Sequence, residues 1–175
     1  MPVVISDTSP LNYLILIGEA EVLPHLYGAV LVPSAVVEEL RRAGTPPAVR
    51  RWVSDPPSWL EIIPRGVVAA QGLGLDLLGE GEREAMALAL NRRADMLLMD
   101  DRDGVEEARR FGLTVTGTLG VLQGAAQRSL LELPEAVMRP QSTNFRASPG
   151  SNPGVVGTRS GQEGSALEKR CFARS

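Results

Sequence analysis

Histidine and cysteine are almost absent from this sequence, and their scarcity excludes several kinds of active site. The chain of 175 residues contains one Cys, Cys171, and one His, His25. A single thiol cannot form an internal disulfide or a thiolate metal cluster. A single imidazole leaves serine and cysteine triads with only one available base, and it excludes most zinc sites. Any bound metal would therefore be held by oxygen ligands, which favour magnesium, manganese or calcium.

Long apolar runs and a basic leader are also missing. The segment NYLILIG (12–18) is far shorter than the ~20 residues that a membrane helix needs, and no basic residues precede the first apolar ones. The chain has 43% hydrophobic residues and a length that suits one domain with a sizeable core. We therefore expect a soluble, cytoplasmic protein.

Lysine is nearly absent, and charge is unevenly distributed. Residues 1–140 hold 13 Arg and 19 acidic residues, a net charge of −6, whereas residues 141–175 carry a net charge of +3. The body of the chain is therefore not a broadly basic nucleic-acid binder. The negative net charge argues modestly against a nucleic-acid substrate. Acids concentrated in one active site can, however, dominate the net charge of a chain.

Apolar periodicity predicts strands that alternate with helices. The expected strands are 3–6, 29–33, 59–64, 96–99 and 113–117, the third of them a short one at an edge. The expected helices are 9–18, short pieces in 21–28, 34–44, 46–55, 79–92, 105–112 and 118–130. Ser9 and Pro10 form a start signal for the first helix, Asp103 and Glu106 resemble a capping box, and Gly112 closes the helix after it. This alternation predicts a parallel sheet with right-handed crossovers.

Acidic residues follow two of these strands. Asp7 ends the first strand, and the stretch LLMDDRDG (97–104) places Asp100, Asp101 and Asp103 within four positions. Helix capping accounts for Asp103 alone. In open parallel sheets ligands bind outside the carboxyl ends of the strands, so we expect Asp7 to face Asp100 and Asp101.

Helical spacing selects two further carboxylates. Glu82 shares the apolar stripe of Ala85, Met86 and Ala89, whereas Glu80 and Glu84 point elsewhere and suit the helix dipole. A core-facing acid must be paired or bound to metal.

On the helix that follows Ser34, Glu39 lies on the inward face, whereas Glu38 is expected to be a solvated partner of arginine. The candidate set is then Asp7, Glu39, Glu82 and Asp101, with Asp100 and Asp103 as neighbours. Such a set suits magnesium or manganese.

Five segments in this order resemble the PIN-domain family, the fold of ribonuclease toxins in bacterial and archaeal toxin–antitoxin pairs. They are ISDTSPLNYL, VPSAVVEEL, GEGEREAMALAL, LLMDDRDG and GLTVTGTLGVL. The likeness is greatest to the branch with a GTLGVL-like segment after the last strand, and it runs from about Val3 to about Ala147. It implies a three-layer α/β sandwich around a central parallel sheet of four to five strands.

The resemblance also implies an activity and roles for individual residues. It implies metal-dependent hydrolysis of single-stranded RNA with Mg²⁺ or Mn²⁺, a small antitoxin as partner, and a homodimer. Asp7, Glu39, Glu82 and Asp101 match the family's catalytic acids, with Asp7, Glu82, Asp101 and Asp103 as metal ligands. Supporting roles fall to Thr8, Ser9, Asp100 and Asp103, with Asp100 either positioning the site or binding water.

Residues 1–147 are therefore the expected nuclease domain, and the Gly, Ser and Pro-rich residues 148–175 are an expected disordered tail. A final helix is expected where this tail begins, so we hypothesise a frameshifted or decayed terminus. Two alternatives stay open: an inactive binding protein of the same fold, and a magnesium-dependent phosphotransfer enzyme. The second is disfavoured because position 9 is Ser, not a second Asp two residues after Asp7.

Overall fold

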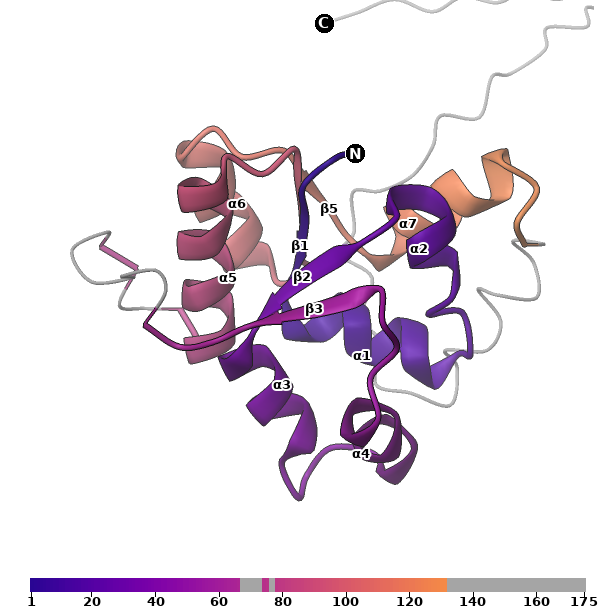
Figure 1. The fold of residues 1–175 in the computed structure, drawn as a ribbon. Coiled ribbons are helices and arrows are strands. Elements are labelled where there is room, and N and C mark those ends of the chain that lie inside the picture. Colours follow the sequence, from indigo (N-terminus) through magenta and orange to yellow (C-terminus); the bar gives the residue numbers. More distant parts are fainter. Residues whose placement is uncertain (67–73, 76–77, 132–175) are drawn as a thin grey trace, which may run out of the picture.

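A five-stranded parallel sheet forms the centre of the computed structural model, which describes residues 1–66, 74–75 and 78–131 (Figure 1). The strands are β1 (Val4–Ser6), β2 (Val30–Pro33), β3 (Leu60–Ile63), β4 (Met96–Leu98) and β5 (Val115–Thr116). The helices are α1 (Thr8–Leu16), α2 (Val22–Tyr27), α3 (Ser34–Arg41), α4 (Pro47–Ser54), α5 (Glu80–Arg92), α6 (Arg102–Arg110) and α7 (Thr118–Gln127). The predicted alternation of strands and helices is confirmed.

The strand order is β3-β2-β1-β4-β5, and every neighbouring pair is parallel. β3 lies at an edge, as its sequence predicted. The chain builds outward from β1 to β3 and then returns to place β4 on the other side of β1. The order therefore reverses between β1 and β4, and ligands of open α/β sheets bind at such a switch point. Asp7 follows β1 and Asp100 follows β4, so both lie at this point.

Alternate residues of the strands face two separate cores. Val4, Val32 and Leu98 point to one side, where α1, α2, α3, α4 and α7 cover them. Ile5 and Leu97 point to the other side, which α5 and α6 cover. Figure 1 shows these helices on opposite sides of the sheet. The period of two along each strand thus produces the three layers of the expected α/β sandwich.

The first helix begins earlier than the sequence indicated. Ser9 was the predicted cap and Pro10 the first helical residue, but α1 starts at Thr8 with Asp7 in the cap position. The reason is that the last link of β1 to the sheet is the Asp7 N–H, which donates to the Leu98 carbonyl at 2.9 Å. The chain then turns directly into the helix. Pro10 fits the third position because the first-turn N–H groups need no helical acceptor.

Two other helix ends also differ from the prediction. α3 ends at Arg41 and not at Gly44, because the backbone leaves the helix at Arg42 and the Thr45 hydroxyl donates to the Glu39 carbonyl. The cap of α6 is Asp101 and not Asp103, because the Asp101 carboxylate accepts from the backbone of the first turn. Gly112 follows α6 with a φ of +77°, a left-handed conformation that glycine adopts without strain.

The expected tail, residues 148–175, lies outside the described residues. Among the helices that the structure describes, none is both long enough and apolar enough to cross a membrane.

Candidate active site

Asp7 is the most deeply buried acid of the site. It follows β1, its exposed fraction is 1%, and its Oδ1 atom is buried with no hydrogen-bond partner in the described part of the chain. Buried polar groups in proteins are almost always paired, because desolvation without a partner costs free energy. An unpaired carboxylate oxygen at the sheet's switch point therefore marks a position where a cation would be favourable.

The surroundings of Asp7 raise its pKa to about 7. Burial is the largest cause, and the charges of Glu82 and Glu39 add to it. The backbone N–H groups of Thr8 and Ser9, at the start of α1, oppose part of the rise. Near neutral pH the carboxyl of Asp7 is therefore poised between its protonated and charged forms.

Glu39 reaches the same site from α3, held by donors of two other helices. The Thr8 hydroxyl donates to its Oε2 at 2.5 Å, and the Gly81 N–H donates to its Oε1 at 3.3 Å. Its side chain is 19% exposed. Glu38, in contrast, is exposed and pairs with Arg65 at 2.7 Å. The inward placement of Glu39 and the solvated arginine pairing of Glu38 are as the helical spacing predicted.

Glu82 lies half-buried in the first turn of α5. Its Oε2 accepts a hydrogen bond from the Gly79 N–H at 3.0 Å. Burial raises its pKa, as do the charges of Asp101, Glu39 and Asp103, although the Gly79 N–H opposes the rise. This coupling links acids from α3, α5 and the end of β4 into one electrostatic group.

Asp101 and Asp100 each cap a helix. Asp101 Oδ1 accepts from the N–H groups of Asp103 and Gly104 at 2.9 and 3.1 Å, at the start of α6. Asp100 faces α7 instead, where its carboxylate accepts from the Thr118 N–H at 2.7 Å and the Thr118 hydroxyl at 2.5 Å. Burial raises the pKa of Asp100, and the hydrogen bonds from Thr118 lower it. Both carboxylate oxygens of Asp100 therefore accept a hydrogen bond from Thr118, which gives this residue a structural role.

The acids converge, but they are held by their own neighbours. Glu39 binds Thr8 and Gly81, Glu82 binds Gly79, and Asp101 binds the start of α6. Within residues 1–66, 74–75 and 78–131, no three acidic or histidine side chains lie close enough together to hold a metal ion as they are placed. The arrangement is a group of electrostatically coupled carboxylates around Asp7 whose side chains would have to move to share a cation.

The sequence reasoning did not identify Gly81, which the structure places against the carboxylate of Glu39. A Cβ added at Gly81 would lie 2.7 Å from Glu39 Oε2 and 3.0 Å from Thr8 Oγ1. The segment GEGE contains a signal for this contact, since a glycine in the first turn of a helix is unfavourable unless something approaches its backbone closely. The partner of that approach, however, comes from a different helix.

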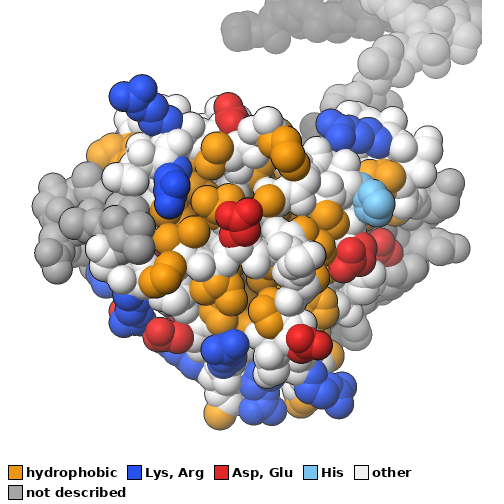
Figure 2. Space-filling view, viewed as in Figure 1, with side chains coloured by type: hydrophobic (Ala, Val, Ile, Leu, Met, Phe, Trp, Pro, Cys, Tyr) orange, Lys and Arg blue, Asp and Glu red, His pale blue; other side chains and the backbone are white. Residues whose placement is uncertain are grey.

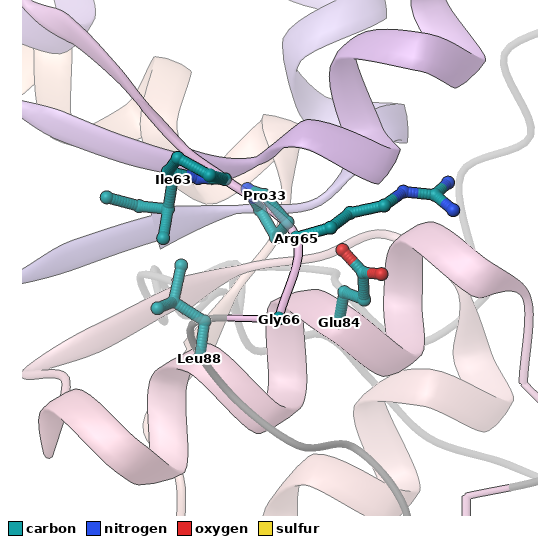
Figure 3. Close-up of a pocket in the computed structure, with 7 residues that line it drawn as sticks. Pro33, Ile63, Arg65, Gly66, Glu84 and Leu88 are labelled. Atoms are coloured by element: carbon teal, nitrogen blue, oxygen red, sulfur yellow. The ribbon is translucent and has the colours of Figure 1, made fainter.

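Glu80 and Glu84, which the sequence places away from the site, lie near Arg65 beyond the end of β3. Glu80 pairs with Arg65 at 3.1 Å, so Arg65 joins α3 to α5 through Glu38 and Glu80. Glu84 lines a small pocket at the end of β3, together with Pro33, Ile63, Pro64, Arg65, Gly66 and Leu88 (Figure 3). With a volume of about 10 Å³, this pocket has room for roughly one water molecule and for no substrate.

The family model that matches this chain is described as a PIN domain, and the match covers residues 3–152. A PilT N-terminus domain protein from the archaeon Sulfolobus solfataricus P2 is similar in structure, with 15% sequence identity and a TM-score of 0.48. The alignment covers 70% of this chain and 92% of that protein. No curated protein matches the sequence significantly.

Proposed function

The chain belongs to the PIN-domain family, whose members are generally nucleases that use divalent metals, and from this premise we propose that it is a metal-dependent endoribonuclease cleaving single-stranded RNA. One observation carries the proposal. Asp7 is buried at the switch point of the sheet with an unpaired carboxylate oxygen, and the charges of Glu39 and Glu82 reach it. A carboxylate cluster of this kind is stabilised by a cation.

The residues present fit a hard divalent ion. Every candidate ligand is a carboxylate oxygen, which suits magnesium and manganese. Asp7, Glu82, Asp101 and Asp103 would hold the ion. When bound, such an ion lowers the pKa of water and stabilises negative charge on a phosphodiester and on its leaving oxygen.

The other residues of the site act by orientation. Thr8 and Gly81 fix the Glu39 carboxylate between α1 and α5 through their hydrogen bonds. Arg42 Nη1 lies 3.9 Å from the same carboxylate, and its side chain is mostly exposed. Its guanidinium group is therefore available to an approaching phosphate. Hydrolysis by this site needs no protein nucleophile, which agrees with the scarcity of histidine and cysteine in the chain.

The biological role belongs to the same proposal. We propose that the protein is the toxin of a toxin–antitoxin pair, that a small antitoxin binds it, that it acts in the cytoplasm and that it forms a homodimer. The support for these points is the family resemblance. Growth arrest on expression, relieved by the product of an adjacent small open reading frame, is the expected result. Normal growth despite active enzyme would contradict the toxin role.

The experiment that tests the activity is cleavage of end-labelled single-stranded RNA by the purified protein. It is run with manganese, with magnesium and with chelator, on the wild type, on Asp7→Asn and on Glu84→Gln as a matched acidic control. We expect cleavage that needs metal, disappears in Asp7→Asn and persists in Glu84→Gln. Absence of cleavage by any version with an intact circular dichroism spectrum would instead favour an inactive binding protein of the same fold.

A further inference from the structure

An open groove with a basic lining lies between α3 and α4, outside the acidic site. Its volume is about 410 Å³, and its lining consists of Arg41, Pro47, Arg50, Arg51 and Ser54. Figure 2 shows several Lys or Arg side chains along the lower edge of the molecule, where Figure 1 places α3 and α4. Three of the five lining residues carry a positive charge, although the whole chain has a net charge of −3.

Within residues 1–66, 74–75 and 78–131, the positive charge of this groove has no acidic partner. Arg42, Arg65, Arg102 and Arg110 all have acidic partners, but no Asp or Glu among the described residues forms an ion pair with Arg41, Arg50 or Arg51. Three guanidinium groups that lack an acidic partner in the described part of the chain surround one groove, and they create a positive potential that attracts anions. Such a concentration in an acidic chain indicates an anionic ligand.

The groove is also held in shape by hydrogen bonds. Arg41 Nη2 donates to the Val53 carbonyl at 3.2 Å, which joins the end of α3 to the end of α4. The Ser54 hydroxyl donates to the Arg50 carbonyl at 2.8 Å. The Nε atom of Arg50 is buried and has no acceptor in the part of the chain that the structure describes. The contact with Val53 thus positions one of the three positive groups, Arg41, before any ligand arrives, which lowers the entropic cost of binding.

The groove and the acidic site both take residues from α3. Glu39 belongs to the site, and Arg42 Nη1 lies 3.9 Å from Glu39 Oε1. Arg41, the residue before Arg42, lines the groove. Basic residues thus follow the site residue Glu39 closely along the chain, and one of them lines the groove. Arginine suits a phosphate ligand because its planar fork matches two phosphate oxygens.

We propose that the α3/α4 groove binds the phosphodiester backbone of single-stranded RNA beside the cleavage site. This inference rests on the proposed ribonuclease function and adds a second contact region for the same substrate. None of the five lining residues is aromatic, so the groove offers no surface on which bases would stack. Binding in the groove is therefore independent of base sequence, and it supplies affinity and direction to the substrate.

The test measures RNA binding in chelator, where no cleavage occurs, by fluorescence anisotropy of a labelled oligouridylate. Arg50→Gln/Arg51→Gln removes two charges of the groove. Arg92→Gln/Arg109→Gln removes two exposed arginines at the ends of α5 and α6 and is the charge-matched control. We expect the groove variant to weaken binding about tenfold and to reduce the salt dependence of log K by about 0.7 for each phosphate that the protein no longer neutralises. An oligoadenylate should show the same weakening, and the control should bind like the wild type.

A second readout separates this inference from the function on which it rests. Cleavage of a minimal dinucleotide substrate, too short to reach the groove, should have the same rate in the groove variant as in the wild type. If the groove variant, the control and the wild type bind RNA with equal affinity, the groove proposal is overturned and the ribonuclease proposal stays intact. The groove would then suit an acidic protein segment. Failure of every version to bind or cleave RNA would overturn both.

Discussion

At the scale of single residues, Asp7 is unfavourable for folding. A carboxylate with 1% exposure loses its hydration, and its Oδ1 atom gains no hydrogen bond in return among the described residues. A residue that opposes folding suggests a functional reason for its presence, because functional sites often sacrifice stability. The consequence is measurable in the metal-free protein as a dependence of stability on pH.

We expect stability to fall as pH rises from about 4 to about 7. Burial raises the pKa of Asp7 from 3.8 to about 7, so the folded state keeps a proton that the unfolded state has already released. By linkage, the free energy of unfolding decreases through this window by about 4 kcal/mol. The pKa values of Glu82 and Asp100 are raised as well and act in the same direction.

Asp7→Asn removes the titrating group and should flatten this dependence. Urea unfolding in chelator at about pH 5 and about pH 8 measures it, with Glu84→Gln as the control. The Asn variant should be more stable than the wild type at the higher pH and inactive at both. If it is less stable than the wild type at the higher pH, Asp7 is not the buried charge that the structure indicates.

Asp101 combines two roles that substitution can separate. Its carboxylate caps α6, and Asn is as good a cap as Asp, whereas Ala is not. We expect Asp101→Asn to keep the stability of the wild type and Asp101→Ala to lose about 1 kcal/mol. Both should lose cleavage activity, because both remove the charge. Thermal unfolding and RNA cleavage measure the two effects, and an active Asp101→Asn variant would reduce Asp101 to a cap.

At the scale of elements, the site depends on how closely the start of α5 approaches α3. Gly81 makes that approach possible, since its backbone donates to Glu39 and its missing side chain leaves room for the carboxylate. The contact joins two helices that are 42 residues apart along the chain, counted from Glu39 to Gly81. It also positions Glu39 toward Asp7, whose pKa it influences.

Gly81→Ala should therefore reduce activity without unfolding the protein. The new methyl group would lie 2.7 Å from Glu39 Oε2, so the Glu39 carboxylate would have to give up its hydrogen bonds and leave its position in the site. We expect at least a tenfold loss of cleavage rate with little change in stability, because Ala favours the helix by up to about 1 kcal/mol.

The matched control for this substitution is Gly124→Ala, in the interior of α7, where the nearest atom to an added Cβ is 4.0 Å away on Leu26. This variant should be slightly more stable than the wild type and equally active. Circular dichroism and RNA cleavage compare the two. Full activity in Gly81→Ala would show that the placement of Glu39 by this contact is unimportant.

At the scale of the whole molecule, the sequence was sufficient for features that depend on periodicity. The parallel sheet, the acids at the ends of β1 and β4, and the inward placement of Glu39 and Glu82 all follow from periods of 2 and 3.6. The helix starts were less accurate. Ser9 and Asp103 carry good capping side chains, yet the sheet and the first turn select Asp7 and Asp101 for those positions.

Contacts between distant elements could not be predicted in this way. The sequence did not indicate that Gly81 touches Glu39 or that Thr118 occupies Asp100, because these contacts depend on the spacing of packed helices. The basic groove between α3 and α4 is a further example. Arg41, Arg50 and Arg51 form a group only after the two helices pack, and the net charge of the chain conceals them.

A bound metal would connect distant parts of the fold, since the proposed ligands come from the ends of β1 and β4 and from α5. A divalent ion that binds the folded state alone should stabilise it by about 2.7 kcal/mol at a concentration one hundred times its Kd. For a chain of this size, each kcal/mol corresponds to about 2–4 °C in Tm. We therefore expect manganese to raise the Tm of the wild type by several degrees and that of Asp7→Asn hardly at all.

The effect of manganese should also depend on pH. Because the pKa of Asp7 is about 7, the ion must displace a proton from it in acid but not in mildly alkaline solution. The increase in Tm should therefore be larger at about pH 8 than at about pH 6, as measured by differential scanning fluorimetry. Glu84→Gln should respond like the wild type. An equal increase in Tm for Asp7→Asn and the wild type would mean that the metal binds elsewhere and that Asp7 is not one of its ligands.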